Sequence, residues 1–343
     1  MPRVGYVYDP LYLEHTVPGH PESAGRLRAI MEHLETQGVL AQMVRIDPRD
    51  ASSEDVLLAH TRELMEQVAA TVPGDHAWID VDTYVTPGSY AAALRAAGGV
   101  VAAVDGVLSG ELASAFCLVR PPGHHATPDR AMGFCLFNNV AIAALHALEQ
   151  TDVERVAIID FDVHHGNGTQ DVFYEDPRAL YFSMHQFPFY PGTGNWDETG
   201  AGAAQGNTIN VPFPRGSGDD AYMTAMSEIC VPALRRFRPD LVLVSAGFDA
   251  HFADPLAGQL VSVKGYFEMA TALRELAYEL CGGRIVYALE GGYDLTAISW
   301  SVHACIDTLL GNDFTPDPLG GSPEVRGPDV SALIERIRQL HGL

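Results

Sequence analysis

Residues 156–167 of the chain read VAIIDFDVHHGN: an apolar, mostly β-branched run followed at once by aspartate, histidine and asparagine side chains. A continuous apolar run of this length is typical of a strand buried on both faces of a parallel sheet. In an open parallel α/β sheet, ligand sites form at the carboxyl ends of the strands. The segment therefore predicts a buried parallel strand with a polar site directly after it.

Three further segments repeat this arrangement. They are RPPGHH (120–125) after the run 115–118, SAGFD (245–249) closing the run 241–246, and EGGY (290–293) after the run 284–289. Because the carboxyl ends of parallel strands meet at one edge of a sheet, we expect the four clusters to lie together.

Apolar runs alternate with helical patterns along the chain. The predicted strands are 4–8, 43–46, 115–118, 156–161, 179–184, 208–211, 241–246 and 284–289. The predicted helices are 22–37, 53–70, 89–108, 138–149, 219–236, 262–280 and 295–309. Alternating strands and helices imply right-handed crossovers and an α/β fold with a mostly parallel sheet. We see no linker or repeat and expect one domain, residues 1–343.

The composition supports a large buried core, since 47% of the 343 residues are apolar and only 19% are charged. The most apolar helical segment, 90–108, is interrupted by Arg95 and Asp105, so we predict no membrane span. The N-terminus lacks the basic and apolar regions of a signal peptide. Five cysteines without C-x-x-C spacing fit a reducing compartment, and we expect a cytoplasmic protein.

The formal net charge is -23. Such a surface repels nucleic acid phosphates and anionic membranes, so neither is an expected partner. It would attract cationic substrates such as lysine-bearing peptides or polyamines, although simple solubility is the better explanation of the charge taken alone.

Asp162 and His164 stand two residues apart on an extended segment, which points both side chains the same way. Asp249, from a different strand end, can supply a third ligand. Two carboxylates and one imidazole would leave a tetrahedral Zn²⁺ ion one open position. A single D-x-H pair would more often be an ordinary polar strand end, but the neighbouring clusters favour a metal site.

The pair His124-His125 follows a rigid Pro-Pro-Gly turn. Asp160 can hold one ring and Asn167 the other, and a ring backed by a carboxylate is the more basic of two. This difference would give the two histidines unlike roles in acid–base chemistry. Tyr293, after two glycines, can donate a hydrogen bond to a developing oxyanion.

This ordered set of motifs resembles the zinc-dependent histone deacetylase and acetylpolyamine amidohydrolase family, particularly its class II and bacterial histone deacetylase-like amidohydrolase members. The resemblance covers nearly the whole chain, through GHPE (19–22), RPPGHHA (120–126), GFCLFNN (133–139), DFDVHHGNGTQ (160–170), PGTG (191–194), SAGFDA (245–250) and LEGGYDL (289–295). Asn167 stands where class I members carry Asp.

The resemblance implies an arginase/deacetylase-like three-layer α/β fold with a central eight-stranded, mainly parallel sheet. It implies zinc on Asp162, His164 and Asp249. It makes His125 the general base, His124 an electrostatic or acid partner, and Tyr293 the group that polarises the substrate carbonyl.

Further roles follow from the same resemblance. Gly133, Phe134 and Tyr190 would belong to an acyl-lysine tunnel, and Asp82 at its rim would hold a peptide backbone. Arg26 would line an internal channel beneath the metal. A structural K⁺ ion is implied near Asp160, Asp162, His164 and Ser183, and often a second near Phe173.

This chain departs from the family pattern at two places that bear on the choice of substrate. Polyamine-selective relatives carry a Glu gatekeeper seven residues after the last zinc ligand, where this chain has Leu256. Segment 75–90 looks too short for the insertion found in bacterial acetylpolyamine enzymes. His251, unusual for the family, is expected at the rim.

We therefore predict a zinc-dependent amidohydrolase that removes acetyl or other short acyl groups from N-acyl-lysine side chains, with an acetylpolyamine deacetylase as the alternative. A binuclear ureohydrolase would need further ligands, and Gly166 stands where an additional carboxylate would be wanted. A non-catalytic acyl-ligand module would not need the full set of base and Tyr residues. A homo-oligomer is compatible with the sequence.

Overall fold

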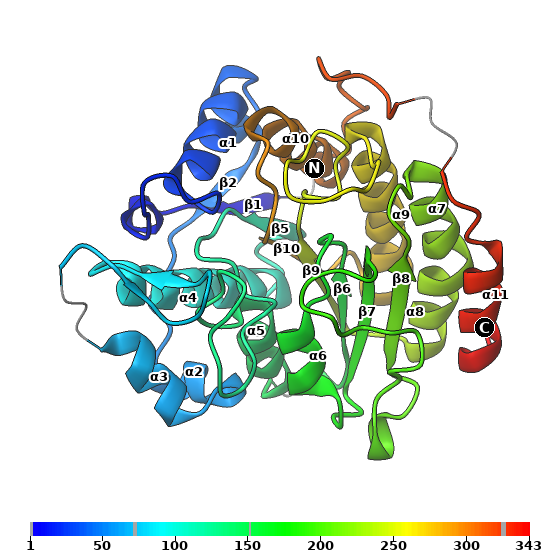
Figure 1. Ribbon diagram of the computed structural model, residues 1–343, viewed down its shortest axis with the longest axis horizontal. Helices are drawn as coiled ribbons and strands as arrows, with labels where there is room; N and C mark the ends of the chain where they lie inside the picture. Colours follow the sequence, from blue (N-terminus) through cyan, green and yellow to red (C-terminus); the bar gives the residue numbers. More distant parts are fainter. Residues whose placement is uncertain (1–2, 71–73, 151, 324–326) are drawn as a thin grey trace.

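The computed structural model describes residues 3–70, 74–150, 152–323 and 327–343; the rest of the predicted domain lies outside the described residues (Figure 1). Its centre is an eight-stranded sheet in the order β2-β1-β5-β10-β9-β6-β7-β8, with every neighbouring pair parallel. The strands are β1 (Val4–Val7), β2 (Val44–Ile46), β5 (Ser114–Cys117), β6 (Val156–Asp160), β7 (Ala179–Gln186), β8 (Thr208–Phe213), β9 (Leu241–Ala246) and β10 (Ile285–Leu289). The predicted α/β class and eight-stranded parallel sheet are confirmed.

Helices cover both faces of this sheet and make three layers (Figure 1). Helices α4, α5 and α6 pack against one face, and α9 and α10 pack against the other. The α-helices are α1 (Ala24–Thr36), α2 (Ser53–Ala59), α3 (Arg62–Ala69), α4 (Ser89–Leu108), α5 (Asn139–Leu148), α6 (Asn167–Phe173), α7 (Asp219–Ala225), α8 (Val231–Phe237), α9 (Val263–Cys281), α10 (Leu295–Leu310) and α11 (Ser331–His341). Short 3₁₀ segments are Pro10–Glu14, Leu40–Gln42 and Gly202–Ala204.

The elements form where local chemistry favours them. All five residues of β6 are buried, as expected for a central strand with helices on both sides. Helix α10 begins after Asp294, whose side chain accepts a hydrogen bond from the Ala297 amide, and it ends at Gly311 in the left-handed conformation. These caps fix α10 directly after the loop that carries Tyr293.

The predicted helix 53–70 is wrong in one respect, because the structure divides it into α2 and α3. His60 between them is extended, and its ring is held by the Thr127 carbonyl (2.9 Å) and the Asn138 amide (2.8 Å). Thr61 then caps α3 by accepting from the Leu64 amide. Long-range contacts to His60 therefore override a helical pattern that is continuous in the sequence.

The predicted helix 219–236 is interrupted by a π-helical turn, Met226–Cys230, between α7 and α8. Pro232 in the next turn has no N–H, and its ring would clash with a carbonyl in a regular α-helix. The short helix α6, the C-terminal helix α11 and the hairpin of β3 (Ala77–Trp78) and β4 (Tyr84–Val85) were not predicted. Helix α6 and the hairpin are too short to give a clear periodic signal. Helix α11 does carry one, because Leu333, Ile334, Ile337 and Leu340 follow helical spacing, and it was overlooked.

Helix α4 is, among the described residues, the one helix long and apolar enough to cross a membrane. However, 61% of its most apolar window is buried inside the fold. A core helix of this kind passes the same test, so α4 is weak evidence for a membrane span.

Candidate active site

Asp162 and His164 lie just past the end of β6, and Asp249 lies past the end of β9, the next strand in the sheet. His164 Nδ1 is 3.1 Å from both Asp162 Oδ1 and Asp249 Oδ2. One ligand atom from each residue lies within 4.8 Å of the other two. The structure thus brings the three expected metal ligands together.

The donor set fits a divalent metal ion. Asp249 Oδ1 accepts from the Val163 amide (2.9 Å), whereas its Oδ2 is buried without a well-aligned donor among the described residues. Burial and the neighbouring Asp162 carboxylate raise the pKa of Asp249. One imidazole N–H cannot satisfy two carboxylates, and a dication between them would relieve the repulsion. Two carboxylates and an imidazole with an open position suit zinc.

The His124-His125 pair follows β5, and its two rings have different partners. His124 Nδ1 is 3.0 Å from Asp160 Oδ2, and His125 Nδ1 is 2.8 Å from Asn167 Oδ1. The Asn167 amide nitrogen donates to the His125 carbonyl, which turns Oδ1 toward the ring. Nδ1 of His125 therefore carries the proton, and Nε2 is left as an acceptor.

The surroundings separate the pKa values of the two histidines. Burial lowers the pKa of His124, but the charges of Asp162 and Asp160 outweigh it and raise the value to about 10. Burial and the neighbouring His124 and His164 lower the pKa of His125 well below its usual range. His124 is therefore suited to hold a proton and His125 to accept one.

Two glycines leave room for these rings. A Cβ atom on Gly133, whose φ is +57°, would lie 2.4 Å from His125 Cδ2. A Cβ atom on Gly166 would lie 2.2 Å from Asp160 Oδ2 and 3.1 Å from His124 Nδ1. No side chain, and hence no extra carboxylate, fits at position 166 unless Asp160, the hydrogen-bond partner of His124, moves.

Tyr293 lies in the loop between β10 and α10 and is held from two sides. Its backbone N–H donates to Asp254 Oδ2 (2.7 Å). The Arg26 guanidinium carbon lies 5.2 Å from the centre of the Tyr293 ring, and Arg26 Nε donates to the Gly292 carbonyl (2.7 Å). Burial and the Asp249 charge raise the pKa of the phenol well above 10, so the hydroxyl stays protonated and can donate.

A pocket of about 190 Å³ opens onto this cluster. The expected tunnel and rim residues Asp82, Gly133, Phe134, Tyr190 and Leu256 all line it, and so do both histidines of the pair, His164 and Tyr293. The pocket therefore joins an aromatic wall to the metal-ligand cluster and the candidate acid–base groups.

Other expected residues lie outside the pocket wall. Arg26 is buried behind Tyr293. Ser183 on β7 stands in register with Asp160 on β6, while Phe173 is buried at the end of α6. The rim position expected for His251 is wrong: its exposed fraction is 1%. The Ala253 amide donates to His251 Nδ1, and the His251 ring packs against the Phe252 ring.

Two buried carboxylates beside the site, Glu290 and Asp254, were not predicted to have a role. Glu290 Oε2 accepts from the backbone N–H groups of Gly123 (2.7 Å) and His124 (3.2 Å), which fixes the turn that carries the His pair. Burial raises the pKa values of Glu290 and Asp254 to about 7 each. Glu290 stands in the quoted EGGY motif, which was the available signal, whereas nothing local marks Asp254.

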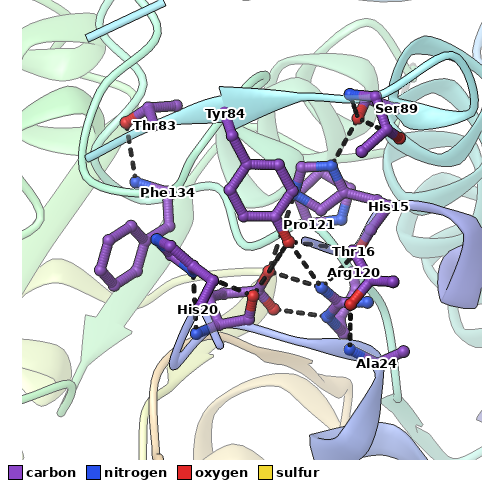
Figure 2. A network of polar contacts seen from close by, with 12 residues as sticks. His15, Thr16, His20, Ala24, Thr83, Tyr84, Ser89, Arg120, Pro121 and Phe134 are labelled. Carbon is purple, nitrogen blue, oxygen red and sulfur yellow. Dashed lines mark hydrogen bonds and ion pairs between the residues drawn. The ribbon is translucent and has the colours of Figure 1, made fainter. Parts of the chain in front are cut away.

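A buried network lies next to the site. Arg120 donates to both carboxylate oxygens of Glu22 and to the carbonyls of Tyr12 (2.9 Å) and His15 (2.6 Å). Figure 2 shows Arg120 and Tyr84 in this network, with Phe134 beyond them. The first residue of the RPPGHH motif therefore anchors the turn rather than facing the pocket.

Comparisons with known proteins agree with this geometry. The histone deacetylase domain model matches residues 20–309. Histone deacetylase 10, chloroplastic, of Oryza sativa subsp. japonica is 43% identical over 96% of this chain and 79% of its own length. The histone deacetylase-like amidohydrolase of Pseudomonas aeruginosa is 39% identical over 96% of this chain and 86% of its own.

A solved structure extends the likeness to the fold. The crystal structure of the HDA15 HD domain superposes with a TM-score of 0.90 at 37% identity, covering 99% of this chain and 94% of that one. The matched region includes every motif around the pocket except the first residue of GHPE. The chain therefore belongs to the histone deacetylase family and is a hydrolase that acts on amides.

Proposed function

We propose that the chain is a zinc-dependent deacylase that removes acetyl or other short acyl groups from N-acyl-lysine side chains of peptides or proteins. The observation that carries the proposal is the single pocket in which the His pair, His164 and Tyr293 meet an aromatic wall of Phe134 and Tyr190. A pocket with aromatic walls of this kind suits the aliphatic stem of a lysine, with its acyl group toward the metal ligands.

Asp162, His164 and Asp249 would hold the zinc ion. When bound, zinc would supply Lewis acidity, which polarises a carbonyl and makes water more acidic. Metal analysis of the purified protein should give about one zinc per chain. Asp249→Ala should lose that zinc, whereas two equivalents in neighbouring positions would contradict the proposal.

His125 would act as the general base. Its Nδ1 proton is held by Asn167 Oδ1, so Nε2 can accept the proton of the attacking water. The water oxygen forms a bond to the acyl carbon while Tyr293 donates a hydrogen bond to the developing oxyanion. When the C–N bond breaks, the leaving amine takes a proton from the His pair, and the acyl group leaves as a carboxylic acid.

Potassium is a further part of the proposal. Asp160 and Ser183 are paired in register on neighbouring strands, and both are fully buried. Buried oxygen ligands of this kind suit a hard monovalent cation, which would offset the Asp160 charge beside His124. A second ion near Phe173 rests on the family resemblance alone.

The substrate test compares kcat/KM for an acetyl-lysine peptide and for N8-acetylspermidine. We expect the peptide to be preferred, because Leu256 in the pocket wall offers no charge for a distant ammonium group. Leu256→Glu should then shift the preference toward the polyamine. A wild-type preference for the polyamine would instead support the acetylpolyamine alternative.

A further inference from the structure

Thr83 joins the rim of the pocket to its wall. Its hydroxyl donates to Asp82 Oδ1 (3.2 Å) and accepts from the backbone N–H of Phe134 (3.1 Å). Thr83 is fully buried, whereas Asp82 and Phe134 both line the pocket. Figure 2 shows the Thr83 hydroxyl directed at the Phe134 amide. One hydroxyl group therefore contacts the preceding residue, Asp82, and Phe134, which lies 51 residues further along the chain.

Phe134 requires such an anchor. Its φ is +69°, in the left-handed region that a side chain as large as Phe rarely adopts. A residue in this conformation persists only where its surroundings hold it. The Thr83 hydroxyl holds the Phe134 backbone, and the His20 ring packs edge-on against the Phe134 ring with centroids 4.7 Å apart. These contacts fix the aromatic wall in one position.

His20, from the GHPE motif, supports the same two residues. The Glu22 amide donates to His20 Nδ1 (3.1 Å), and His20 Nε2 lies 3.2 Å from the Asp82 carbonyl oxygen. The two ring nitrogens of His20 contact the Glu22 backbone on one side and the Asp82 backbone on the other. The rim loop at Asp82 is thus held through its carbonyl by His20 and through its carboxylate by Thr83.

This arrangement leaves Asp82 with one oxygen for a ligand. Oδ1 is engaged by Thr83, and Oδ2 has no hydrogen-bond partner within the described parts of the chain. A carboxylate at a pocket mouth with one fixed and one open oxygen suits a backbone N–H donor next to the acyl-lysine. The Thr83 carbonyl in turn accepts from the Ile79 amide (2.8 Å), which closes the hairpin turn behind Asp82.

We propose that Thr83 is a positioning residue for peptide recognition. Its hydroxyl aims the Asp82 carboxylate at a substrate backbone N–H and keeps the Phe134 ring against the lysine stem. This rests on the proposed lysine deacylase function and on the rim role that the family resemblance implies for Asp82.

The test compares Thr83→Val, which keeps the shape of the side chain but removes the hydroxyl, with Thr83→Ser, which keeps the hydroxyl. With an acetyl-lysine peptide, Thr83→Val should raise KM about tenfold, the effect of one hydrogen bond to a charged group, and change kcat less than about twofold. Thr83→Ser should stay near the wild-type KM. Thr83→Ala repeats the deletion if the Val variant does not fold.

An Asp82→Ala background shows whether Thr83 acts through Asp82. There the KM effect of Thr83→Val should shrink to about twofold or less, because coupled residues are not additive. Peptide binding to the Tyr293→Phe variant, measured by calorimetry, should give the same pattern in Kd without turnover. An unchanged KM in Thr83→Val and Thr83→Ala, a loss confined to kcat, or full additivity with Asp82→Ala would overturn the inference. A wild-type protein that neither binds nor cleaves the peptide would overturn the proposed function as well.

Discussion

At the residue scale, the two adjacent histidines differ most in the side chain that forms a hydrogen bond with Nδ1 of each ring. His124 faces the Asp160 carboxylate, and His125 faces the neutral Asn167 amide. We expect His125→Ala to lose about 10²–10⁴-fold in kcat, the usual range for a general base, and His124→Ala to lose less. Zinc content should be retained in both variants. Near-normal turnover in His125→Ala would show that the base is assigned to the wrong ring.

Tyr293 offers a second test at this scale. Tyr293→Phe removes only the hydroxyl, while the Arg26 and Asp254 contacts to the ring and backbone remain. The variant should fold and keep its metal but lose about 10²–10³-fold in kcat, as when one oxyanion donor is removed. Steady-state kinetics with an acetyl-lysine peptide measures this. A change mainly in KM would mean that Tyr293 binds the ground state and the transition state equally.

At the element scale, the break between α2 and α3 depends on one buried side chain. His60→Ala would leave the Thr127 carbonyl and the Asn138 amide without their partner. Each unsatisfied buried group costs about 1–3 kcal/mol, so for two groups we expect the free energy of unfolding to fall by about 2–6 kcal/mol. Urea denaturation measures the loss. His76→Ala, at an exposed position, is the matched control and should change it little.

At the scale of the whole molecule, the buried Glu22 ties the N-terminal segment to the turn before the active site. Burial opposes its ionisation, but the Arg120 and Arg26 guanidinium groups outweigh burial and lower the pKa of Glu22 to about 2, from an ordinary 4.5. A depressed carboxyl pKa stabilises the fold above the unfolded value. That stabilisation, about 3 kcal/mol, is lost as the pH falls from about 4.5 toward 2.

The free energy of unfolding, measured against pH, should therefore fall less steeply between pH 4.5 and 2 in Glu22→Gln than in the wild type. Glu32→Gln, on the exposed side of α1, is the control and should follow the wild-type curve. If Glu22→Gln and the wild type lose stability with the same slope, Glu22 is not ionised in the folded protein at low pH.

The sequence by itself determined the sheet and the position of its polar edge. Continuous apolar runs specify buried parallel strands, which place the residues after β5, β6, β9 and β10 at one edge of the sheet. The sheet order makes these four strands neighbours. The D-x-H spacing and Asp249 are local features of those strand ends. For that reason the metal ligands and the partners of His124 and His125 could be proposed from the sequence.

Only the tertiary structure decided how loops and neighbouring side chains complete the site. The periodic pattern of residues 53–70 favours one helix, but His60 finds its partners 67 and 78 residues away. His251 is buried although a rim position was expected, and Thr83 meets the Phe134 amide across 51 residues. Periodicity reports which face of an element is buried, whereas such contacts depend on how distant segments pack, which no local pattern encodes.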